Sequence, residues 1–172
     1  MRVIAGELKG RRLKAPTWNT LRPTSDKLRE TLFNVVAQRV TGARVLDLYA
    51  GTGAIGIEAL SRGASHVTFI DTDARARKLI EENLRHCGIE DRYVIIRTPQ
   101  SLPAGSFDLA VLDPPYDEPD LTASIAAAER LVSPDGLLVL EHARRRPAPD
   151  QVGRLRKTRD LLSGDSALAF YL

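Results

Sequence analysis

The stretch Arg44-Val-Leu-Asp-Leu-Tyr-Ala-Gly-Thr-Gly-Ala-Ile-Gly56 decides the fold. Its first five residues form a mostly apolar run, which is typical of a buried strand. Gly51, Gly53 and Gly56 follow at the G-x-G-x-x-G spacing and lead into a predicted helix. Glycine at such a junction permits a tight turn and lets a ligand approach the backbone closely. The stretch therefore predicts a strand, a ligand-binding loop and a helix in succession.

The rest of the chain repeats this alternation of strand and helix. Strands are expected at residues 44–48, 66–71, 93–98, 107–112 and 137–141, and helices at 54–62, 74–87 and 121–132. This order indicates a parallel sheet with helices on both faces, joined by right-handed crossovers. Residues 154–162 and 166–172 instead predict two strands joined by a tight turn. We therefore expect an α/β fold whose seven-stranded, mostly parallel sheet ends in an antiparallel hairpin.

The amino-terminal part carries a different pattern. Residues 3–15 alternate loosely between apolar and polar side chains and contain glycines at two turn positions, which predicts a short basic β-hairpin. A loop rich in proline and polar residues follows. Thr24 or Ser25 can then cap a helix that is expected to run from Asp26 to about Val40.

Length and composition are those of an ordinary globular domain. The chain has 172 residues, of which 43% are hydrophobic and 27% charged. We expect a single domain over residues 1–172, with 1–23 as a basic hairpin and loop and 24–172 as the core with its leading helix. The start lacks the apolar stretch of a signal peptide, and no apolar run is long enough to span a bilayer. We therefore expect a cytoplasmic protein.

Basic residues concentrate near both ends of the chain. Residues 1–34 hold eight basic and three acidic side chains, and residues 142–160 hold seven basic and two acidic ones, although the whole chain carries only +3. Either segment alone fits an ordinary solvated surface. Together they favour a polyanionic substrate. The single cysteine, and the absence of a metal-ligand spacing among His, Cys and acidic residues, argue against a metal site.

A second motif, Asp113-Pro114-Pro115-Tyr116, follows the apolar run at residues 107–112. It should lie just beyond the carboxyl end of a strand, where open α/β sheets bind their ligands. A carboxylate accepts hydrogen bonds, prolines hold an extended backbone with free carbonyls, and an aromatic ring offers a stacking face to a base. The motif therefore suits an exocyclic amino group on a planar ring, although alone it also fits a simple turn at the end of a strand.

The glycine loop leaves the cofactor open between two classes. Asp71 stands twenty residues after Gly51, where a carboxylate can accept hydrogen bonds from ribose hydroxyls. By spacing alone a dinucleotide fits equally well. Asp47, however, would bring negative charge close to the pyrophosphate of a dinucleotide. The same charge suits the ammonium group of S-adenosylmethionine, which is therefore the favoured cofactor.

Together, the motifs of the chain resemble those of a known enzyme family. Residues 45–53, Asp71 and Asp-Pro-Pro-Tyr at 113–116 resemble class I S-adenosylmethionine-dependent methyltransferases that act on an amino nitrogen. The segment Arg22-Pro-Thr-Ser-Asp-Lys-Leu-Arg-Glu-Thr-Leu-Phe-Asn34 is similar to the signature of the RsmD family, and Gly-Arg-Arg-Leu at 10–13 fits that family's basic hairpin. RsmD enzymes methylate the exocyclic N2 of one guanine in small-subunit ribosomal RNA. The resemblance covers nearly the whole chain and implies a Rossmann-like fold.

The resemblance also implies roles for individual residues. We expect the following to act in catalysis: Asp113, Pro114 and Tyr116. We expect the following to bind S-adenosyl-L-methionine: Asp47, Tyr49, Gly51, Gly53, Asp71, Thr72 and Asp113. We expect the following to bind the substrate: Arg11, Arg12, Arg22, Thr24, Asp26, Pro115 and Tyr116. The expected partner is 16S ribosomal RNA within the small subunit or an assembly intermediate, and the protein is expected to act as a monomer.

Three other functions remain open from the sequence. An N6-adenine methyltransferase of DNA or RNA can carry the same Asp-Pro-Pro-Tyr motif, but such enzymes often have a separate target-recognition domain for which this chain has no room. A nicotinamide-dependent oxidoreductase can use the same glycine loop. A ribosome-assembly RNA-binding protein could keep the fold without the chemistry, although the intact Asp113 and glycines argue against it.

Overall fold

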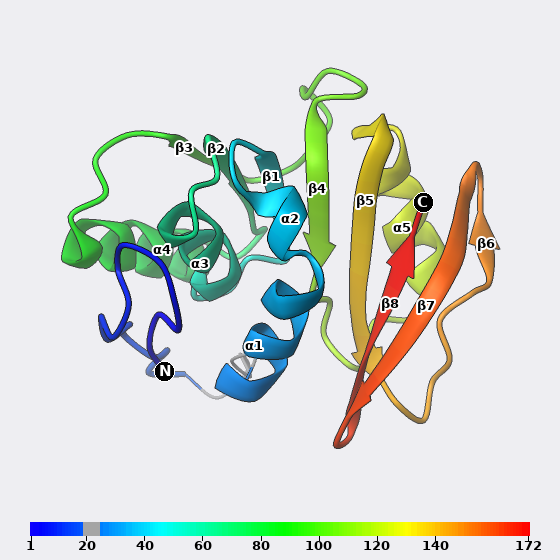
Figure 1. The fold of residues 1–172 in the computed structure, drawn as a ribbon, viewed down its shortest axis with the longest axis horizontal. Helices are drawn as coiled ribbons and strands as arrows, with labels where there is room; N and C mark the ends of the chain where they lie inside the picture. Colours follow the sequence, from blue (N-terminus) through cyan, green and yellow to red (C-terminus); the bar gives the residue numbers. More distant parts are fainter. Residues whose placement is uncertain (19–24) are drawn as a thin grey trace.

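The computed structural model of the chain describes residues 1–18 and 25–172, and Figure 1 shows their arrangement. The helices are α1 (Asp26–Val35), α2 (Ala37–Val40), α3 (Ala54–Ser61), α4 (Ala74–Cys87) and α5 (Leu121–Glu129). The strands are β1 (Arg44–Leu48), β2 (His66–Ile70), β3 (Tyr93–Ile96), β4 (Phe107–Leu112), β5 (Val132–Ala143), β6 (Gln151–Val152), β7 (Leu155–Ser163) and β8 (Ser166–Tyr171).

The strands form one sheet in the order β3-β2-β1-β4-β5-β8-β7-β6. Every pairing from β3 through β5 is parallel, whereas β8 pairs antiparallel with both β5 and β7. This confirms the expected α/β fold with a carboxyl-terminal antiparallel hairpin. The expected strand number of seven is wrong, because the short strand β6 pairs with the start of β7 and makes eight. A two-residue strand is too short to leave a periodic pattern in the sequence.

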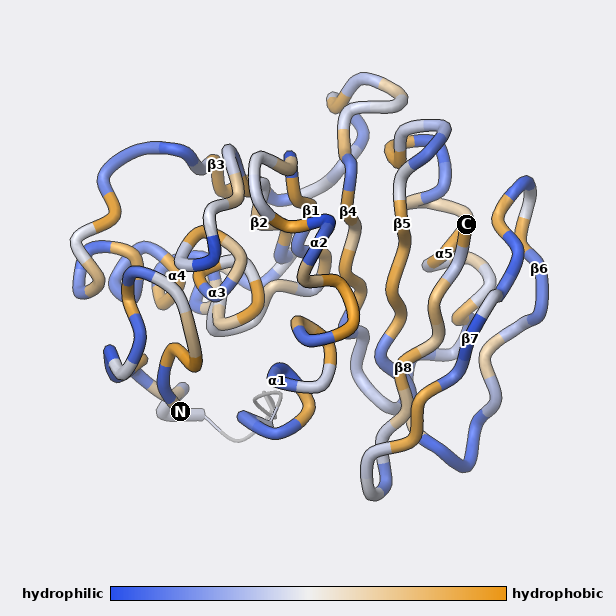
Figure 2. The backbone as a smooth tube through the Cα atoms, viewed as in Figure 1, coloured by the Kyte–Doolittle hydropathy of each residue, from blue (hydrophilic) through white to orange (hydrophobic). Residues whose placement is uncertain are grey.

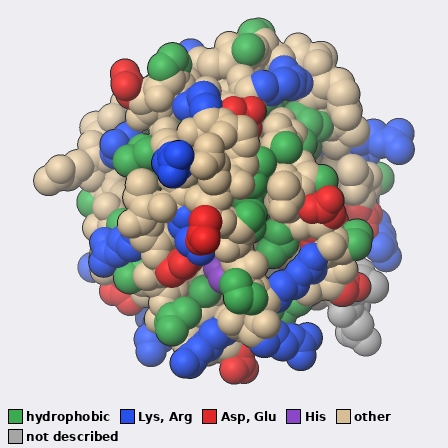
Figure 3. Space-filling view, turned by 90° about the vertical axis from the view of Figure 1, so that its right-hand side faces the viewer, with side chains coloured by type: hydrophobic (Ala, Val, Ile, Leu, Met, Phe, Trp, Pro, Cys, Tyr) green, Lys and Arg blue, Asp and Glu red, His purple; other side chains and the backbone are tan. Residues whose placement is uncertain are grey.

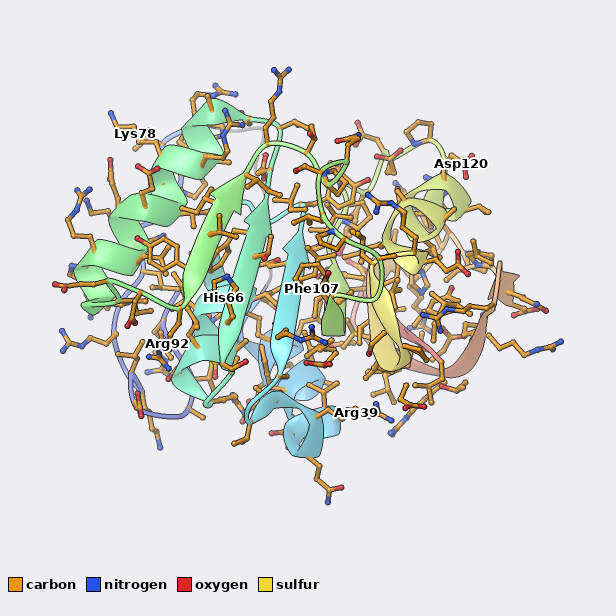
Figure 4. All side chains as sticks on the ribbon, turned by 90° about the horizontal axis from the view of Figure 1, so that it is seen from above. Arg39, His66, Lys78, Arg92, Phe107 and Asp120 are labelled. Atoms are coloured by element: carbon orange, nitrogen blue, oxygen red, sulfur yellow. The ribbon has the colours of Figure 1, made fainter. Side chains whose placement is uncertain are left out.

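Two hydrophobic clusters hold helices to opposite faces of the sheet. Side chains alternate between the faces along a strand, so Val45 joins the cluster under α1, α3 and α4 while Leu46 joins the cluster under α5. Figure 2 shows the apolar colouring concentrated in the central strands. In Figure 4 Arg39 of α2 and Asp120, which precedes α5, lie on opposite sides of the row of strands that contains Phe107. Helices thus cover both faces of the sheet, so a ligand-binding site is expected at the ends of the strands.

The helix ends follow local capping chemistry. The Ser25 hydroxyl accepts a hydrogen bond from the backbone N–H of Leu28 and so starts α1. The expected continuation of this helix to Val40 is wrong, because the backbone leaves helical geometry at Val36 and resumes only as the short α2. Helix α5 also ends earlier than expected, since Val132 pairs with Phe107 and already belongs to β5. No helix in the described part of the chain is long and apolar enough to cross a membrane.

The amino-terminal segment lies against α3 and α4 (Figure 1). The expected β-hairpin is present in a short form: one antiparallel bridge joins Arg2 and Arg12, and three backbone hydrogen bonds link its two arms. The fully buried carboxylate of Glu58 also accepts the backbone N–H groups of Ile4 and Ala5 at 2.7 and 3.0 Å. Contacts to α3 therefore add to the few hydrogen bonds within the hairpin itself.

Candidate active site

Acidic side chains meet at the carboxyl ends of the parallel strands. Leu48, Ile70, Leu112 and Leu140 are partners in one row across β1, β2, β4 and β5. The next residue on each strand is therefore also brought to the same edge, and three of these four are acidic: Asp71, Asp113 and Glu141. The backbone N–H of Asp113 donates to the carbonyl of Leu48 at 3.2 Å, which fixes the start of the Asp-Pro-Pro-Tyr motif beside the end of β1.

The glycine loop joins this edge through Asp71. One carboxylate oxygen of Asp71 accepts the backbone N–H of Gly51 and the other accepts that of Asp73, both at 2.9 Å. Gly51 and Gly53 have φ values of 54° and 76°, in the left-handed region that favours glycine. At Gly56 a Cβ atom would lie 2.2 Å from the Phe69 ring, so α3 can pack on β2 only without a side chain there. The motif thus requires glycine for two reasons: the left-handed backbone conformation at Gly51 and Gly53, and the close packing of α3 on β2 at Gly56.

Asp47 is the most deeply buried acid of the site. Its side chain is 1% exposed, and one oxygen accepts the backbone N–H of Gly56 at 2.9 Å. Burial raises the pKa of Asp47 well above its usual range, and the charges of Asp113 and Asp71 raise it further. The other oxygen, Oδ1, has no hydrogen-bond partner among the described residues. A buried acceptor without a donor fits a ligand that brings an N–H group or a positive charge.

The Asp-Pro-Pro-Tyr motif turns toward β5 and β8. Pro114 is buried, whereas Pro115 is exposed. The Tyr116 hydroxyl donates to Oε1 of Glu141 at 3.3 Å and also hydrogen-bonds the Ser166 hydroxyl. A narrow pocket behind the motif is lined by both prolines, Tyr116 and Glu141, together with side chains of α5 and the segment after β5. The tyrosine is therefore held by its hydroxyl end.

Two further expected cofactor residues lie at the same edge. Tyr49 directly follows β1, is half-buried and hydrogen-bonds the Ser124 hydroxyl of α5 at 2.9 Å. Burial raises the pKa of the Tyr49 phenol. Thr72 follows Asp71, is exposed, and its carbonyl accepts a hydrogen bond from Arg77 at 2.9 Å. Tyr49 thus lies between Asp71 and Asp113 in the row across the sheet, and Thr72 lies next to Asp71.

The expected substrate residues outside the Asp-Pro-Pro-Tyr motif fall into three groups. Arg11 and Arg12 are exposed on the amino-terminal segment. Asp26 lies at the start of α1, where its carboxylate accepts from the guanidinium of Arg29 at 2.9 Å. Arg22 and Thr24 lie outside the described residues. The described residues contain no group of three potential metal ligands.

Sequence reasoning missed Glu141 as part of the site region, and it missed Arg29 as a buried link between α1 and the amino-terminal segment. Arg29 is fully buried and also donates to the carbonyl of Arg2 at 2.6 Å, which ties α1 to the amino-terminal segment. Arg29 lies three residues after Asp26 in the same helix, and this spacing was a usable sequence signal for the ion pair between them. Glu141 was expected only as the last residue of a strand. The sequence signal that could have identified Glu141 is a charged residue at the end of an apolar strand that neighbours β4.

The chain matches, over residues 1–172, the protein family described as "Conserved hypothetical protein 95". It is 38% identical over 180 residues to the Bacillus subtilis protein YlbH, and the match covers 99% of this chain and 98% of that protein. It is 34% identical to the Haemophilus influenzae ribosomal RNA small subunit methyltransferase D, with 86% and 81% covered. The chain belongs to the RsmD family of methyltransferases. This confirms the resemblance seen in the sequence motifs.

A solved structure supports the same family at the level of the fold. The RsmD-family chain superimposes on the Escherichia coli protein yhhF with a TM-score of 0.86 at 27% identity, and 99% of this chain and 96% of that one are covered. A Pyrococcus horikoshii protein with only 16% identity still gives a TM-score of 0.76, so the Rossmann-like methyltransferase fold extends to distant sequences.

Proposed function

We propose that this RsmD-family methyltransferase transfers a methyl group from S-adenosylmethionine to the exocyclic N2 amine of a guanine in 16S ribosomal RNA, acting as a monomer. One observation carries the proposal: Asp113 and the buried Pro114 directly follow β4, and the backbone N–H of Asp113 donates to the carbonyl of Leu48 at the end of β1, where the glycine loop begins. An amino-group acceptor and a nucleotide-type loop thus share one edge of the sheet.

The residues of the loop fit S-adenosylmethionine. Asp71 already accepts two backbone N–H groups, and a carboxylate retains further lone pairs for ribose hydroxyls. The unpartnered Oδ1 of Asp47 suits the ammonium group, directly or through water. We assign contacts with the rest of the molecule to Tyr49, Gly51, Gly53 and Thr72. When bound, the cofactor supplies an electrophilic methyl group on a sulfonium centre.

At the target base, Asp113 and Pro114 act on the amine. The guanine amine is a poor nucleophile because its lone pair is delocalised into the ring. The Asp113 carboxylate and the Pro114 carbonyl accept its two N–H bonds, which draws the nitrogen toward tetrahedral geometry and aims its lone pair. Asp113 also stabilises the positive charge that develops on nitrogen, and positioning of the two reactants supplies much of the acceleration. Tyr116 and Pro115 contact the base after it leaves its own stack.

The RNA substrate is inferred from charge and from relatives. The Haemophilus influenzae relative is named for small-subunit ribosomal RNA. Arg11 and Arg12 are exposed and free to contact phosphates, which position the RNA without reading its sequence. A domain of this size offers little surface for sequence recognition, so we infer that the shape of the small subunit or of an assembly intermediate supplies much of the selection.

The experiment that tests the proposal identifies the modified base. Purified protein is incubated with S-adenosylmethionine and small ribosomal subunits that lack the modification, and the RNA is digested to nucleosides for mass spectrometry. We expect N2-methylguanosine as the product. N6-methyladenosine would show the alternative amine substrate, and the absence of any transferred methyl group, with the cofactor bound, would overturn the enzymatic proposal.

A further inference from the structure

Glu141 occupies a position that the proposed reaction does not yet use. The pairing of Leu140 with Leu112 places Glu141 in β5 next to Asp113 at the end of β4. Glu141 is 5% exposed, and none of the salt bridges among the described residues includes it. A buried carboxylate without a cationic partner is costly, so an ionised Glu141 would be poorly stabilised here.

The hydrogen bonds around Glu141 fix its protonation. Oε1 accepts from the Tyr116 hydroxyl at 3.3 Å, and Tyr116 is itself joined to Ser166 of β8. No N–H or O–H group of the described residues donates to Oε2, which is buried. The remaining neighbour is the Asp113 carboxyl, which the pairing of β4 with β5 brings next to Glu141 and whose proximity raises the pKa of Glu141. Two adjacent ionised carboxylates repel each other, so the pair favours a state in which one of them is protonated.

The proton resides on the more buried partner. Burial, then the charge of Asp113 and the hydrogen bond with it, raise the pKa of Glu141 to about 9, while the bonds from Ser166 and Tyr116 only partly oppose this. Asp113 is less buried than Glu141. At neutral pH Glu141 is therefore in its neutral form beside the Asp113 carboxyl.

We propose that neutral Glu141 is a positioning residue: its carboxyl O–H donates to the Asp113 carboxylate while its carbonyl oxygen accepts from Tyr116. This inference rests on the proposed function and deepens it. Glu141 thereby holds both Asp113 and Tyr116, the first and last residues of the motif, to β5. Asp113 stays ionised and oriented, with oxygen lone pairs left for the amine. Loss of the Glu141 proton removes the donor and places two negative charges side by side.

The protonation of Glu141 determines the direction in which the rate of methyl transfer changes with pH. Glu141 is neutral below a pKa of about 9 and ionises above it, so methyl transfer should fall as the pH rises through that range. The guanine itself also titrates in alkaline solution. The variant E141Q separates these causes, because its amide keeps a donor for Asp113 and an acceptor for Tyr116 but cannot ionise.

The test compares single-turnover methyl transfer on small subunits by wild type, E141Q and E141A from pH 6 to 10. We expect E141Q to keep nearly the wild-type rate at neutral pH and to retain more of it in alkaline solution. We expect E141A to lose on the order of tenfold to a hundredfold, the effect of one hydrogen bond to a charged group, with little change in cofactor affinity by calorimetry. The exposed α4 variant E81Q controls for the change of carboxyl to amide.

Two outcomes would overturn the assignment: E141Q as slow as E141A, or an alkaline decline in E141Q identical to that of the wild type. A readout without turnover separates this proposal from the proposed function. The infrared difference spectrum of wild type minus E141Q should contain the C=O stretch of a protonated carboxyl at neutral pH and lose it in alkaline solution. Its absence would refute neutral Glu141 even in an active enzyme, and its presence in an enzyme inactive on guanine would refute only the reaction.

Discussion

At the scale of the residue, Asp71 shows how one side chain serves structure and site together. Its carboxylate holds the glycine loop through Gly51 and the start of α4 through Asp73. The sequence interval between Gly51 and Asp71 was enough to predict that the two come together. The interval could not show that they bond to each other directly. A substitution at Asp71 would therefore disturb the loop itself, which makes this residue a poor probe of cofactor binding alone.

The contact between Glu141 and Asp113 could not be predicted from the sequence. Asp113 stands in a motif that is legible in the sequence, but the neighbourhood of the two residues depends on the pairing register of β4 with β5. That register includes an irregularity between Phe107 and Leu109, where β5 gains extra residues. Pro134 and Gly136 lie in that stretch, and such residues fit a turn as well as a bulge, so the register could not be predicted from them. The chemistry of the motif could thus be predicted, and its supporting residue could not.

At the scale of the element, strong local signals set the boundaries that were predicted correctly. Helix α4 begins and ends as expected because Asp73 caps its first turn and Gly88 adopts the left-handed conformation after its last residue. Strands β1 and β4 also match their expected ranges. Strand β5 starts five residues earlier than expected, since Pro134 and Gly136 resemble a turn while the backbone there continues the strand.

The docking of the amino-terminal segment on α3 gives a prediction at this scale. The variant E58A removes a fully buried carboxylate and leaves the N–H groups of Ile4 and Ala5 without acceptors. We expect a loss of about 3 kcal/mol in the free energy of unfolding, measured by urea denaturation. Hydrogen exchange should also rise in residues 2–12. The exposed Glu7 provides the matched control, because E7A should change stability by less than about 0.5 kcal/mol.

If E58A left both stability and exchange at the wild-type level, the segment would not be held by this contact. The expected basic hairpin would then have to be stable without α3. One bridge between Arg2 and Arg12 makes that outcome hard to sustain, since short isolated hairpins are marginal in water.

At the scale of the whole molecule, the basic amino-terminal segment and the basic strand β7 lie far apart. The amino-terminal segment packs by α3 and α4, while β7 lies at the opposite end of the sheet (Figure 1). Figure 3 looks onto the β6–β7 side, where acidic side chains are interspersed among the lysines and arginines. Lys157 of β7, for example, is paired with both Asp150 and Asp160 at 3.0 Å. The amino-terminal segment is therefore the better candidate for the main RNA contact.

This arrangement predicts a difference between two double variants in RNA binding. R11A/R12A should weaken binding to small-subunit RNA and reduce the slope of log affinity against log salt by about 1.5, because each lost phosphate contact contributes about 0.7 to 0.9. R144A/R145A, in the second basic segment, should change the slope by less. Fluorescence anisotropy over a range of salt concentrations measures both. A larger loss in R144A/R145A would instead place the main RNA contact at the segment that follows β5.

The central claim is that Asp113 grips the amine that receives the methyl group, and the most direct measurement is single-turnover methyl transfer to small subunits by D113A, with D113N beside it. We expect D113A to lose on the order of a hundredfold or more in rate while RNA affinity stays close to that of the wild type. D113N, which keeps an oxygen acceptor, should fall between the two. A D113A enzyme that forms N2-methylguanosine at the wild-type rate would contradict the account.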